Sequence, residues 1–481
     1  MAVFFAVILL VIVLIHLYLY KRLVLDPLRP GRWRRVGTVI AAGLMLLVPA
    51  TLIGVRAGHV KWLAWPGYLW IALMFYLLIT LLVLEIPRLV VRLAWVRRGR
   101  AGKLAEEKRS GGAAVSGSQV AGAAPAAGSQ KPVLAGAGTG SETPALAGAG
   151  TGSETPALAG AEIGTETPAL AGTATGGGSP GRVRGVSDTI AESAAVAAGT
   201  TSPDRADGGV DRRLVLARGA AIFAGLTAAS VTGFGIRTAT GAPRIDRVRL
   251  PIAKLPRAMD GTRLAVVSDI HLGPLTGIGH TERITRVINS VDADLVCVVG
   301  DLVDGSVAEL GRLAEPLRGI ESRHGAYFVT GNHEYYSGYQ QWIDEVAELG
   351  MRPLRNERVA IEGLDLAGVN DLGGEEHGDP ADFGKALGDR DTSRPVVLMA
   401  HQPLAAKQAA PYGVDLQVSG HTHGGQMAPF NLLVKLQQPV VSGFGRVDGV
   451  PVYVTNGAGF WGPPVRVGAP PQVTVVELRV A

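Results

Sequence analysis

The chain has 481 residues, of which 47% are hydrophobic, and a formal net charge of +5. This length accommodates a membrane part and one large domain, since single domains contain roughly 100–250 residues. Its Lys and Arg residues cluster beside apolar segments and no nucleic-acid-binding motif is present, so we expect no nucleic-acid recognition. The single cysteine, Cys297, excludes an intramolecular disulfide, so the soluble part must be stabilised by its core.

Four segments have the length and composition to span a bilayer, because about 20 apolar residues cross roughly 30 Å of hydrocarbon. For each of them a buried core helix is the alternative, most of all for the last, which is rich in Ala and Gly. No cleaved signal peptide is expected at residues 1–20, since no basic region precedes the apolar run. The segments are residues 3–20, 36–55, 67–84 and 219–236.

Basic residues beside these segments predict their orientation. Six Lys or Arg residues lie in 21–35 and six in 88–103, whereas the loop between the second and third segments carries only Arg56 and Lys61. By the positive-inside rule the two basic stretches are cytoplasmic, so the amino terminus lies outside. A fourth span then carries everything after residue 237 outward. We therefore expect a multi-pass cell-membrane protein whose catalytic domain is extracytoplasmic, following a membrane domain of three helices at 1–100.

The segment 211–238 has a second interpretation. Arg212 and Arg213 are followed by Leu-Val-Leu and an apolar run, which resembles a twin-arginine export signal. The segment departs from that pattern at Val215 and Ala217 and is internal. Alternatively, the paired arginines simply anchor a fourth transmembrane helix.

The stretch from 101 to 210 is rich in Ala, Gly, Ser, Thr and Pro. A 12-residue unit, such as "ALAGAGTGSETP", repeats four times over 133–180. Short repeats can form solenoids, but each unit offers too little apolar area to offset the entropy of ordering the chain. We therefore predict a flexible, disordered linker.

From about residue 240 to 481, short β-like runs alternate with helix-like stretches, which predicts a layered α/β domain. Polar residues follow five of these runs, at the positions where such folds build their sites. The runs are 263–269, 294–301, 326–332, 395–401, 415–421 and 451–457. The polar residues at their ends are Asp269, Asp301, Asn332, His401 and His421.

These residues belong to short motifs typical of metal binding. In chain order they read D-I-H at 269–271, G-D at 300–301, G-N-H-E at 331–334, a lone His401, and G-H-T-H at 420–423. Alternation in an extended chain would point residues i and i+2 to the same side. Asp269 with His271, and His421 with His423, would then face one cleft. Mixed Asp, Asn and His ligands suit Mn, Fe, Zn or Co. Two such ions about 3.5–4 Å apart can clamp a phosphate for attack by hydroxide.

With these motifs in this order, residues 263–460 resemble a calcineurin-like metallophosphoesterase, and "GHTHGGQ" and "TNGAGFWGPPVRVG" resemble its membrane-associated or exported bacterial branch. The resemblance implies a metallophosphoesterase-type αββα sandwich and two divalent ions. It implies that Asp301 bridges both ions and that His333 is a non-ligand histidine that binds the phosphate or protonates the leaving oxygen. The ligands implied for the first ion are Asp269, His271 and His423, and for the second Asn332, His401 and His421.

The sequence thus predicts a membrane-anchored hydrolase of phosphate mono- or diesters. Attachment to the membrane suggests lipid or cell-envelope substrates, such as a nucleotide-linked lipid precursor, and no protein partner is inferred. Arg466 is a candidate for binding the substrate phosphate, although a solvated loop arginine is the alternative. Glu334 either supports a neighbouring ligand or is a surface charge. The alternative function is a non-catalytic metal-binding membrane sensor, but all seven ligand positions are filled.

Overall fold

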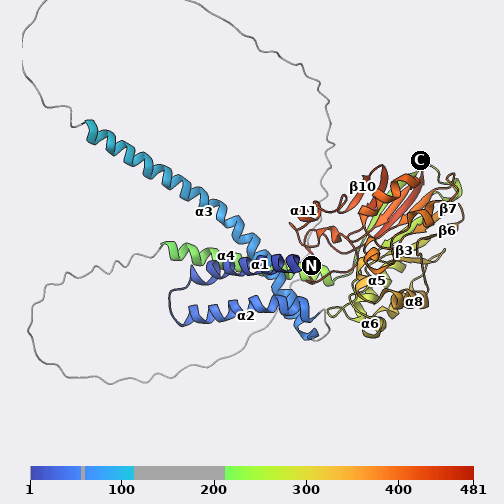
Figure 1. Ribbon diagram of the computed structural model, residues 1–481, viewed down its shortest axis with the longest axis horizontal. Helices are drawn as coiled ribbons and strands as arrows, with labels where there is room; N and C mark the ends of the chain where they lie inside the picture. The colour runs from blue at the N-terminus through green and yellow to red at the C-terminus, as the bar shows by residue number, and fades with distance from the viewer. Residues whose placement is uncertain (1, 56–59, 113–211) are drawn as a thin grey trace, which may run out of the picture. The chain divides into compact units, whose positions relative to one another are not determined.

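The structure is a computed structural model that describes residues 2–55, 60–112 and 212–481 (Figure 1). The expected linker at 101–210 therefore lies largely outside the described residues. The described elements before Gly102 and after Gly209 belong to one compact unit.

Long apolar helices occur at all four expected places. Each is long and apolar enough, by length and composition, to cross a membrane. Only 11–28% of each apolar window is buried, so the alternative of a buried core helix does not fit. The helices are α1 (Ala2–Tyr20), which continues as the π-helix η1 (Lys21–Leu25), α2 (Arg32–Gly54), α3 (Ala64–Gly112) and α4 (Arg212–Thr240).

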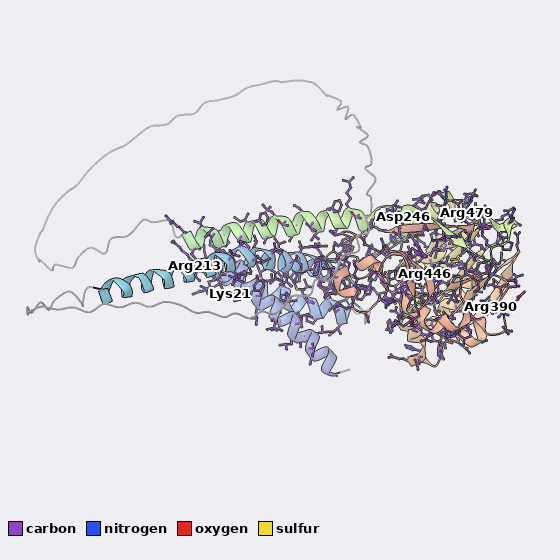
Figure 2. The ribbon with its side chains drawn as sticks, turned by 90° about the horizontal axis from the view of Figure 1, so that it is seen from above. Lys21, Arg213, Asp246, Arg390, Arg446 and Arg479 are labelled. Carbon is purple, nitrogen blue, oxygen red and sulfur yellow. The ribbon has the colours of Figure 1, made fainter. Side chains whose placement is uncertain are left out.

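The two ends of α4 contact different parts of the chain. Near its start, Nε of Arg218 donates to the carbonyl oxygen of Pro27 at 3.0 Å, beside the basic stretch 21–35. Near its end, the carbonyl of Gly235 accepts the backbone N–H of Arg466 at 3.0 Å. In Figure 2, Lys21 and Arg213 accordingly lie among the helices, whereas Arg446 and Arg479 lie on the α/β domain. Helix α4 therefore contacts the basic stretch 21–35 at its start and the α/β domain at its end.

Two six-stranded sheets form the α/β domain. In the first, the order is β1-β12-β2-β3-β4-β5, and β2 to β5 are parallel. In the second, the order is β10-β11-β9-β8-β7-β6, and β7, β8, β9 and β11 are parallel. The bounds of the first sheet's strands are Arg244–Ile252 (β1), Gln472–Val480 (β12), Arg263–Val267 (β2), Leu295–Val299 (β3), Ala326–Val329 (β4) and Met351–Pro353 (β5). Those of the second are Gly443–Val447 (β10), Val450–Val454 (β11), Leu416–Ser419 (β9), Val396–Met399 (β8), Leu364–Gly368 (β7) and Glu357–Ile361 (β6).

Strand β3 shows how one apolar run builds two cores. Its residues 295–299 read Leu-Val-Cys-Val-Val and are all buried. Because side chains alternate across a strand, Val296 and Val298 enter one core while Leu295, Cys297 and Val299 enter another. A continuous apolar run is typical of a parallel strand covered on both faces.

Three layers of core give the expected αββα sandwich. The first core lies between sheet one and the helices α5 (Ile278–Ser290), α6 (Val307–Ala314) and α8 (Tyr339–Glu348). The second core joins the two sheets. The third lies between sheet two and the short helices α9 (Phe383–Leu387) and α10 (Ala406–Ala409). The remaining short helices are α7 (Asn332–Tyr336) and α11 (Asn431–Val434).

Candidate metal centre

Metal-capable residues follow five parallel strands at nearly constant spacing. Asp269 lies two residues after β2, Asp301 two after β3 and Asn332 three after β4. On the second sheet, His401 lies two residues after β8 and His421 two after β9. Parallel strands of one sheet end at the same edge, so each sheet delivers its polar residues to one place. The face-to-face packing of the sheets then brings the two places together.

The backbone turns sharply at most of these residues. Asp269, His271, Asp301, His421 and His423 all have positive φ, between 49° and 70°. The extended alternation expected from the sequence is therefore wrong, because the chain adopts left-handed backbone angles at the ligands after β2, β3 and β9. Non-glycine residues in this conformation cost about 1–2 kcal/mol each and persist where the surrounding contacts impose them.

Glycines allow the ligand loops to approach one another closely. A Cβ added at Gly420 would lie 2.4 Å from Oδ2 of Asp269. One added at Gly331 would lie 2.9 Å from Cγ of Asp301. Both positions thus require glycine for the loops to meet.

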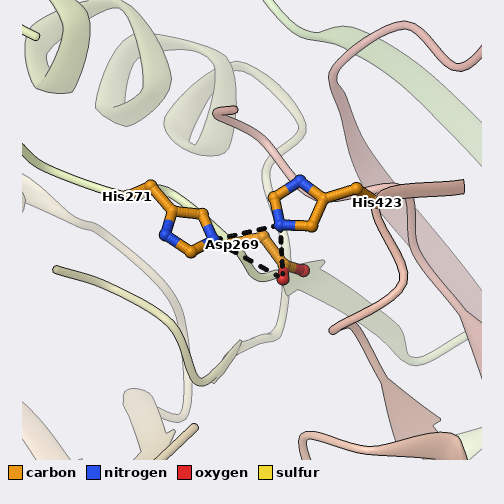
Figure 3. A group of neighbouring side chains, drawn as sticks. All are labelled: Asp269, His271 and His423. Atoms are coloured by element: carbon orange, nitrogen blue, oxygen red, sulfur yellow. Dashed lines mark hydrogen bonds and ion pairs between the residues drawn. The ribbon is translucent and has the colours of Figure 1, made fainter. Parts of the chain in front are cut away.

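The first group of ligand candidates contains Asp269, His271 and His423 (Figure 3). Nε2 of His423 lies 3.3 Å from Oδ1 of Asp269 and 3.0 Å from Nε2 of His271. The three candidate donor atoms lie within 4.8 Å of one another, and all three residues are buried. The sequence predicted these three residues as one set.

The second group contains Asp301, His401 and His421. Oδ2 of Asp301 lies 3.1 Å from Nε2 of His401 and 3.8 Å from Nε2 of His271 in the first group. Nδ1 of His421 lies 3.0 Å from Oδ1 of Asn332, which brings the predicted amide ligand into this group. Asp301 therefore lies between the two groups, as its expected bridging role requires.

His401 provides a test of whether a cation fits. Its Nδ1 lies 2.8 Å from the carbonyl oxygen of Val299, so Nδ1 carries a hydrogen and Nε2 is the nitrogen directed at Asp301, 3.1 Å from Oδ2. Nε2 is buried, and this carboxylate is its one polar neighbour among the contacts described. Burial opposes a charge on this ring, but Asp301 outweighs it and raises the pKa of His401 well above the ordinary value. The buried carboxylates thus favour a positive charge at this position, which a divalent metal ion would also supply. The donor set fits such a cation.

The two histidines of the G-H-T-H motif, His421 and His423, are held in their neutral form. Burial lowers the pKa of His421 to about 3, and the neighbouring His401 adds to the effect. Burial, with Arg466 beside it, also lowers the pKa of His423 well below its usual range. Neutral imidazole is the form that binds metals.

Asp304 was missed by the sequence reasoning and orients two histidines. Its Oδ1 accepts from Nδ1 of His271 at 2.9 Å and from Nδ1 of His333 at 2.7 Å. A carboxylate behind a ligating histidine fixes the ring and its tautomer. Burial opposes protonation of His333, but Asp301 and Asp304 outweigh it and raise its pKa to about 9. The signal available in the sequence was an acid three residues after Asp301, within "GDLVDG".

Glu334 is buried and supports the backbone of a ligand loop. Its carboxylate accepts the N–H of Asp301 at 2.9 Å, of Leu302 at 2.7 Å and of Gly331 at 2.6 Å. It thereby joins the loop of Asp301 to that of Asn332. Of the two roles considered for Glu334, the structure shows support of a neighbouring loop and excludes a surface charge.

Arg466 occupies a different environment from the one considered for a substrate-binding residue. It is 0% exposed, so a solvated position is excluded as well. Its Nη2 lies 3.0 Å from Nδ1 of His423. Its guanidinium donates to the backbone carbonyls of His423, Asn456, Gly459 and Ala469. These acceptors occupy the guanidinium, so Arg466 positions the loops around His423 and does not present its charge to a substrate.

Comparisons with known proteins agree with this geometry. A family model described as calcineurin-like phosphoesterase matches residues 262–425. An uncharacterized metallophosphoesterase of Aquifex aeolicus is 34% identical over 246 residues, which cover 49% of this chain and 92% of that protein. The chain belongs to the calcineurin-like phosphoesterase family. Its α/β domain is therefore a metallophosphoesterase domain, as the motifs predicted.

Two similar proteins are named as transmembrane proteins. A "Transmembrane protein with metallophosphoesterase domain" from Danio rerio is 36% identical over 274 residues, which cover 54% of this chain and 63% of that protein. The protein of the same name from Bos taurus is 35% identical over 294 residues, covering 58% of this chain and 66% of that protein. The chain thus spans just under two thirds of the length of these relatives.

Proposed function

We propose that this protein is a membrane-anchored, metal-dependent phosphoric ester hydrolase that uses two divalent ions, Mn, Fe, Zn or Co. The observation that carries the proposal is the meeting of two ligand groups at Asp301. His333, which forms a third candidate group with His271 and Asp304, is assigned a non-ligand role because Asp304 already engages its Nδ1. Asp269, His271 and His423 would hold one ion, and Asn332, His401 and His421 the other. Such ions polarise phosphoryl oxygens and lower the pKa of water, which supplies a nucleophile at neutral pH.

His333 is the residue proposed to act on the substrate itself. It lies next to a cavity that also reaches His271 and Asp304. Because Nδ1 of His333 is engaged by Asp304, Nε2 is the nitrogen left to donate to a phosphoryl or leaving-group oxygen. Asp304 keeps this ring oriented and favours its positive charge, which opposes the negative charge that develops in the transition state.

The membrane placement rests on contacts at both ends of the helices. Nζ of Lys61, in the loop between the second and third spans, lies 2.6 Å from Oε1 of Glu309 in the phosphoesterase domain. Arg218 contacts Pro27 at the opposite, basic end. These contacts support four membrane crossings with the domain on the same side as the 56–63 loop, which the positive-inside rule assigns to the exterior. A substrate in or near the bilayer, such as a lipid-linked phosphate ester, suits this location.

A hydrolysis assay tests the proposed activity. The full chain, reconstituted with Mn²⁺, should hydrolyse bis(p-nitrophenyl) phosphate, and Asp301→Asn and His421→Ala should each lower kcat/KM by at least about 100-fold. The matched control is His324→Ala, since His324 belongs to none of the ligand groups found among the described residues. Equal activity in the wild type and both site variants would exclude the dinuclear site. Metal binding without any hydrolysis would favour the sensor instead.

A second comparison separates the two roles considered for His333. A p-nitrophenolate leaving group needs no proton, whereas an alkoxide does. If His333 is the general acid, His333→Ala should slow hydrolysis of an alkyl ester at least about tenfold more than that of the aryl ester. Equal losses on both esters would assign it to charge stabilisation.

A reporter at the carboxy terminus tests the orientation. A reporter active only outside the cytoplasm should be active when fused after Ala481. A silent reporter would reverse the proposed topology.

A further inference from the structure

A cavity of about 470 Å³ lies beside the metal centre and has walls from two parts of the chain. Its inner wall contains His271, Asp304 and His333. Its outer wall contains Leu52 and Val55 from the end of α2 and Tyr68 from α3. The ends of membrane-type helices therefore complete a cavity that reaches the catalytic residues.

Both parts of the chain contribute apolar residues to the outer wall. From the phosphoesterase domain, Phe460 and Trp461 line the same cavity as Leu52 and Val55. The Trp461 ring lies 6.0 Å from that of His333, centroid to centroid, and its side chain is 55% exposed. Leu52 is 42% exposed although it lines the cavity. Of the four apolar residues, Val55 and Phe460 are 7% and 4% exposed, so Leu52 and Trp461 supply the accessible apolar surface of the cavity. Apolar surface that stays accessible in a cavity beside a catalytic histidine is typical of a ligand-binding site.

Residues of the membrane-type helices and the loop between them contact the phosphoesterase domain around this cavity. Lys61 and Glu309, whose ion pair was described above, both line it. The Tyr68 ring packs on the backbone of Gly462, where an added Cβ would lie 3.5 Å from Cε1 of the ring. The half-exposed ion pair contributes little stability by itself. It shows which helix ends adjoin the site.

Chemically, the cavity is divided. Its inner end offers histidines and a carboxylate beside the metal ligands, whereas Leu52, Val55, Phe460 and Trp461 offer hydrocarbon and aromatic surface. The charges of Lys61 and Glu309, which also line the cavity, neutralise each other in an ion pair. A small hydrophilic phosphate ester would fill the inner end and leave the outer wall in water. An ester that carries a hydrocarbon chain would satisfy both ends, and each buried methylene contributes about 0.8 kcal/mol, or about fourfold in affinity.

We propose that the outer wall formed by Leu52, Val55, Phe460 and Trp461 binds the hydrocarbon part of an amphiphilic phosphate ester, so that the membrane helices contribute directly to substrate selection. This inference rests on the proposed hydrolase function. It names the substrate class as a phosphate ester with an alkyl or acyl chain next to the phosphate, and assigns Leu52 as a specificity-determining residue supplied by α2.

Competition between two inhibitors tests the inference without knowledge of the natural headgroup. The full chain in nanodiscs hydrolyses bis(p-nitrophenyl) phosphate with Mn²⁺ while ethyl phosphate or octyl phosphate is added. Octyl phosphate has six more methylenes, and burial of only three of them predicts an inhibition constant about 60-fold lower than that of ethyl phosphate. In Leu52→Gln this preference should fall at least tenfold.

Ile53→Gln is the matched control. Ile53 is the next residue of α2, is 70% exposed and does not line the cavity. Octyl phosphate also enters the lipid, but equally so at equal nanodisc concentration, so the difference between the two variants reports the cavity. Ile53→Gln should keep the wild-type preference. A wild type that does not distinguish the two inhibitors, or equal effects of both substitutions, would overturn this inference alone, whereas a wild type without Mn²⁺-dependent hydrolysis would overturn the proposed function.

Discussion

The buried carboxylate of Glu334 offers a direct test of how the ligand loops are held. In Glu334→Gln the side chain keeps its shape, but one oxygen becomes an NH₂ group. The amide oxygen can still accept from Asp301 and Gly331, which both donate to Oε2. The NH₂ group then faces the N–H of Leu302, which donates to Oε1 in the wild type. A buried donor thus loses its acceptor.

The expected cost follows from these three bonds. An unsatisfied buried N–H costs about 1–3 kcal/mol. Burial and the charge of Asp301 raise the pKa of Glu334 to about 7, so the comparison is made at pH 8.5, where the carboxylate is ionised. There the two remaining bonds lose their charged acceptor, which roughly halves their strength and adds about 1 kcal/mol. The free energy of unfolding should therefore fall by about 2–4 kcal/mol. For a domain of this size each kcal/mol shifts Tm by about 2–4 °C, so Tm should fall by roughly 4–16 °C.

Thermal unfolding of the full chain, followed by tryptophan fluorescence, measures the effect. EDTA is present throughout, so that ion binding adds nothing to the stability. Glu376→Gln is the control, because Glu376 is exposed and a surface substitution of this kind changes stability by about 0.5 kcal/mol or less. If Glu334→Gln melts within 2 °C of this control, the three hydrogen bonds do not hold the loops as argued.

Three further predictions concern other parts of the domain. Asp304→Asn should weaken Mn²⁺ binding by about 10–100-fold in calorimetric titration, because the ring of His271 loses the carboxylate that orients it, and unchanged affinity would contradict this. Arg466→Met should lower the free energy of unfolding by at least about 3 kcal/mol, since several buried carbonyls lose their donor, and an unchanged Tm would refute that role. Burial raises the pKa of the Cys297 thiol to about 12, so Ellman's reagent at pH 8 should label it only after unfolding, and rapid labelling of the folded chain would show that β3 is accessible.

Much of the fold and of the site could be predicted because the signals are local. The central parallel strands are continuous apolar runs, and each ligand follows its strand within two or three residues. The four apolar helices are likewise set by composition over some 20 residues. The edge strands β1, β5, β6 and β10 were not predicted, because strands at an edge are short or partly exposed and lack the continuous apolar run. The internal strands β7 and β12 were also missed, because polar residues interrupt their apolar runs, which read LDLAG and QVTVVELRV.

The sequence did not predict the roles of residues whose partners lie far away in the chain. Arg466 looked like a loop arginine in the sequence, and only the fold surrounds its guanidinium with carbonyls from two loops, the one after β9 and the one between β11 and β12. Asp304 had no motif of its own, yet it lies against rings at positions 271 and 333. The expected extended backbone at the ligands was wrong because local alternation does not foresee left-handed turns that tertiary contacts impose.

By itself, the sequence determined which side chains can ligate metal, their order along the chain and the apolar segments that precede them, because each of these is written in a few consecutive residues. Only the tertiary structure decided that Asp301 lies between two ligand groups and that the end of α2 borders the catalytic cavity. Such contacts join residues from 30 to more than 200 positions apart, and they depend on strand order and on the packing of two sheets, which no local pattern specifies.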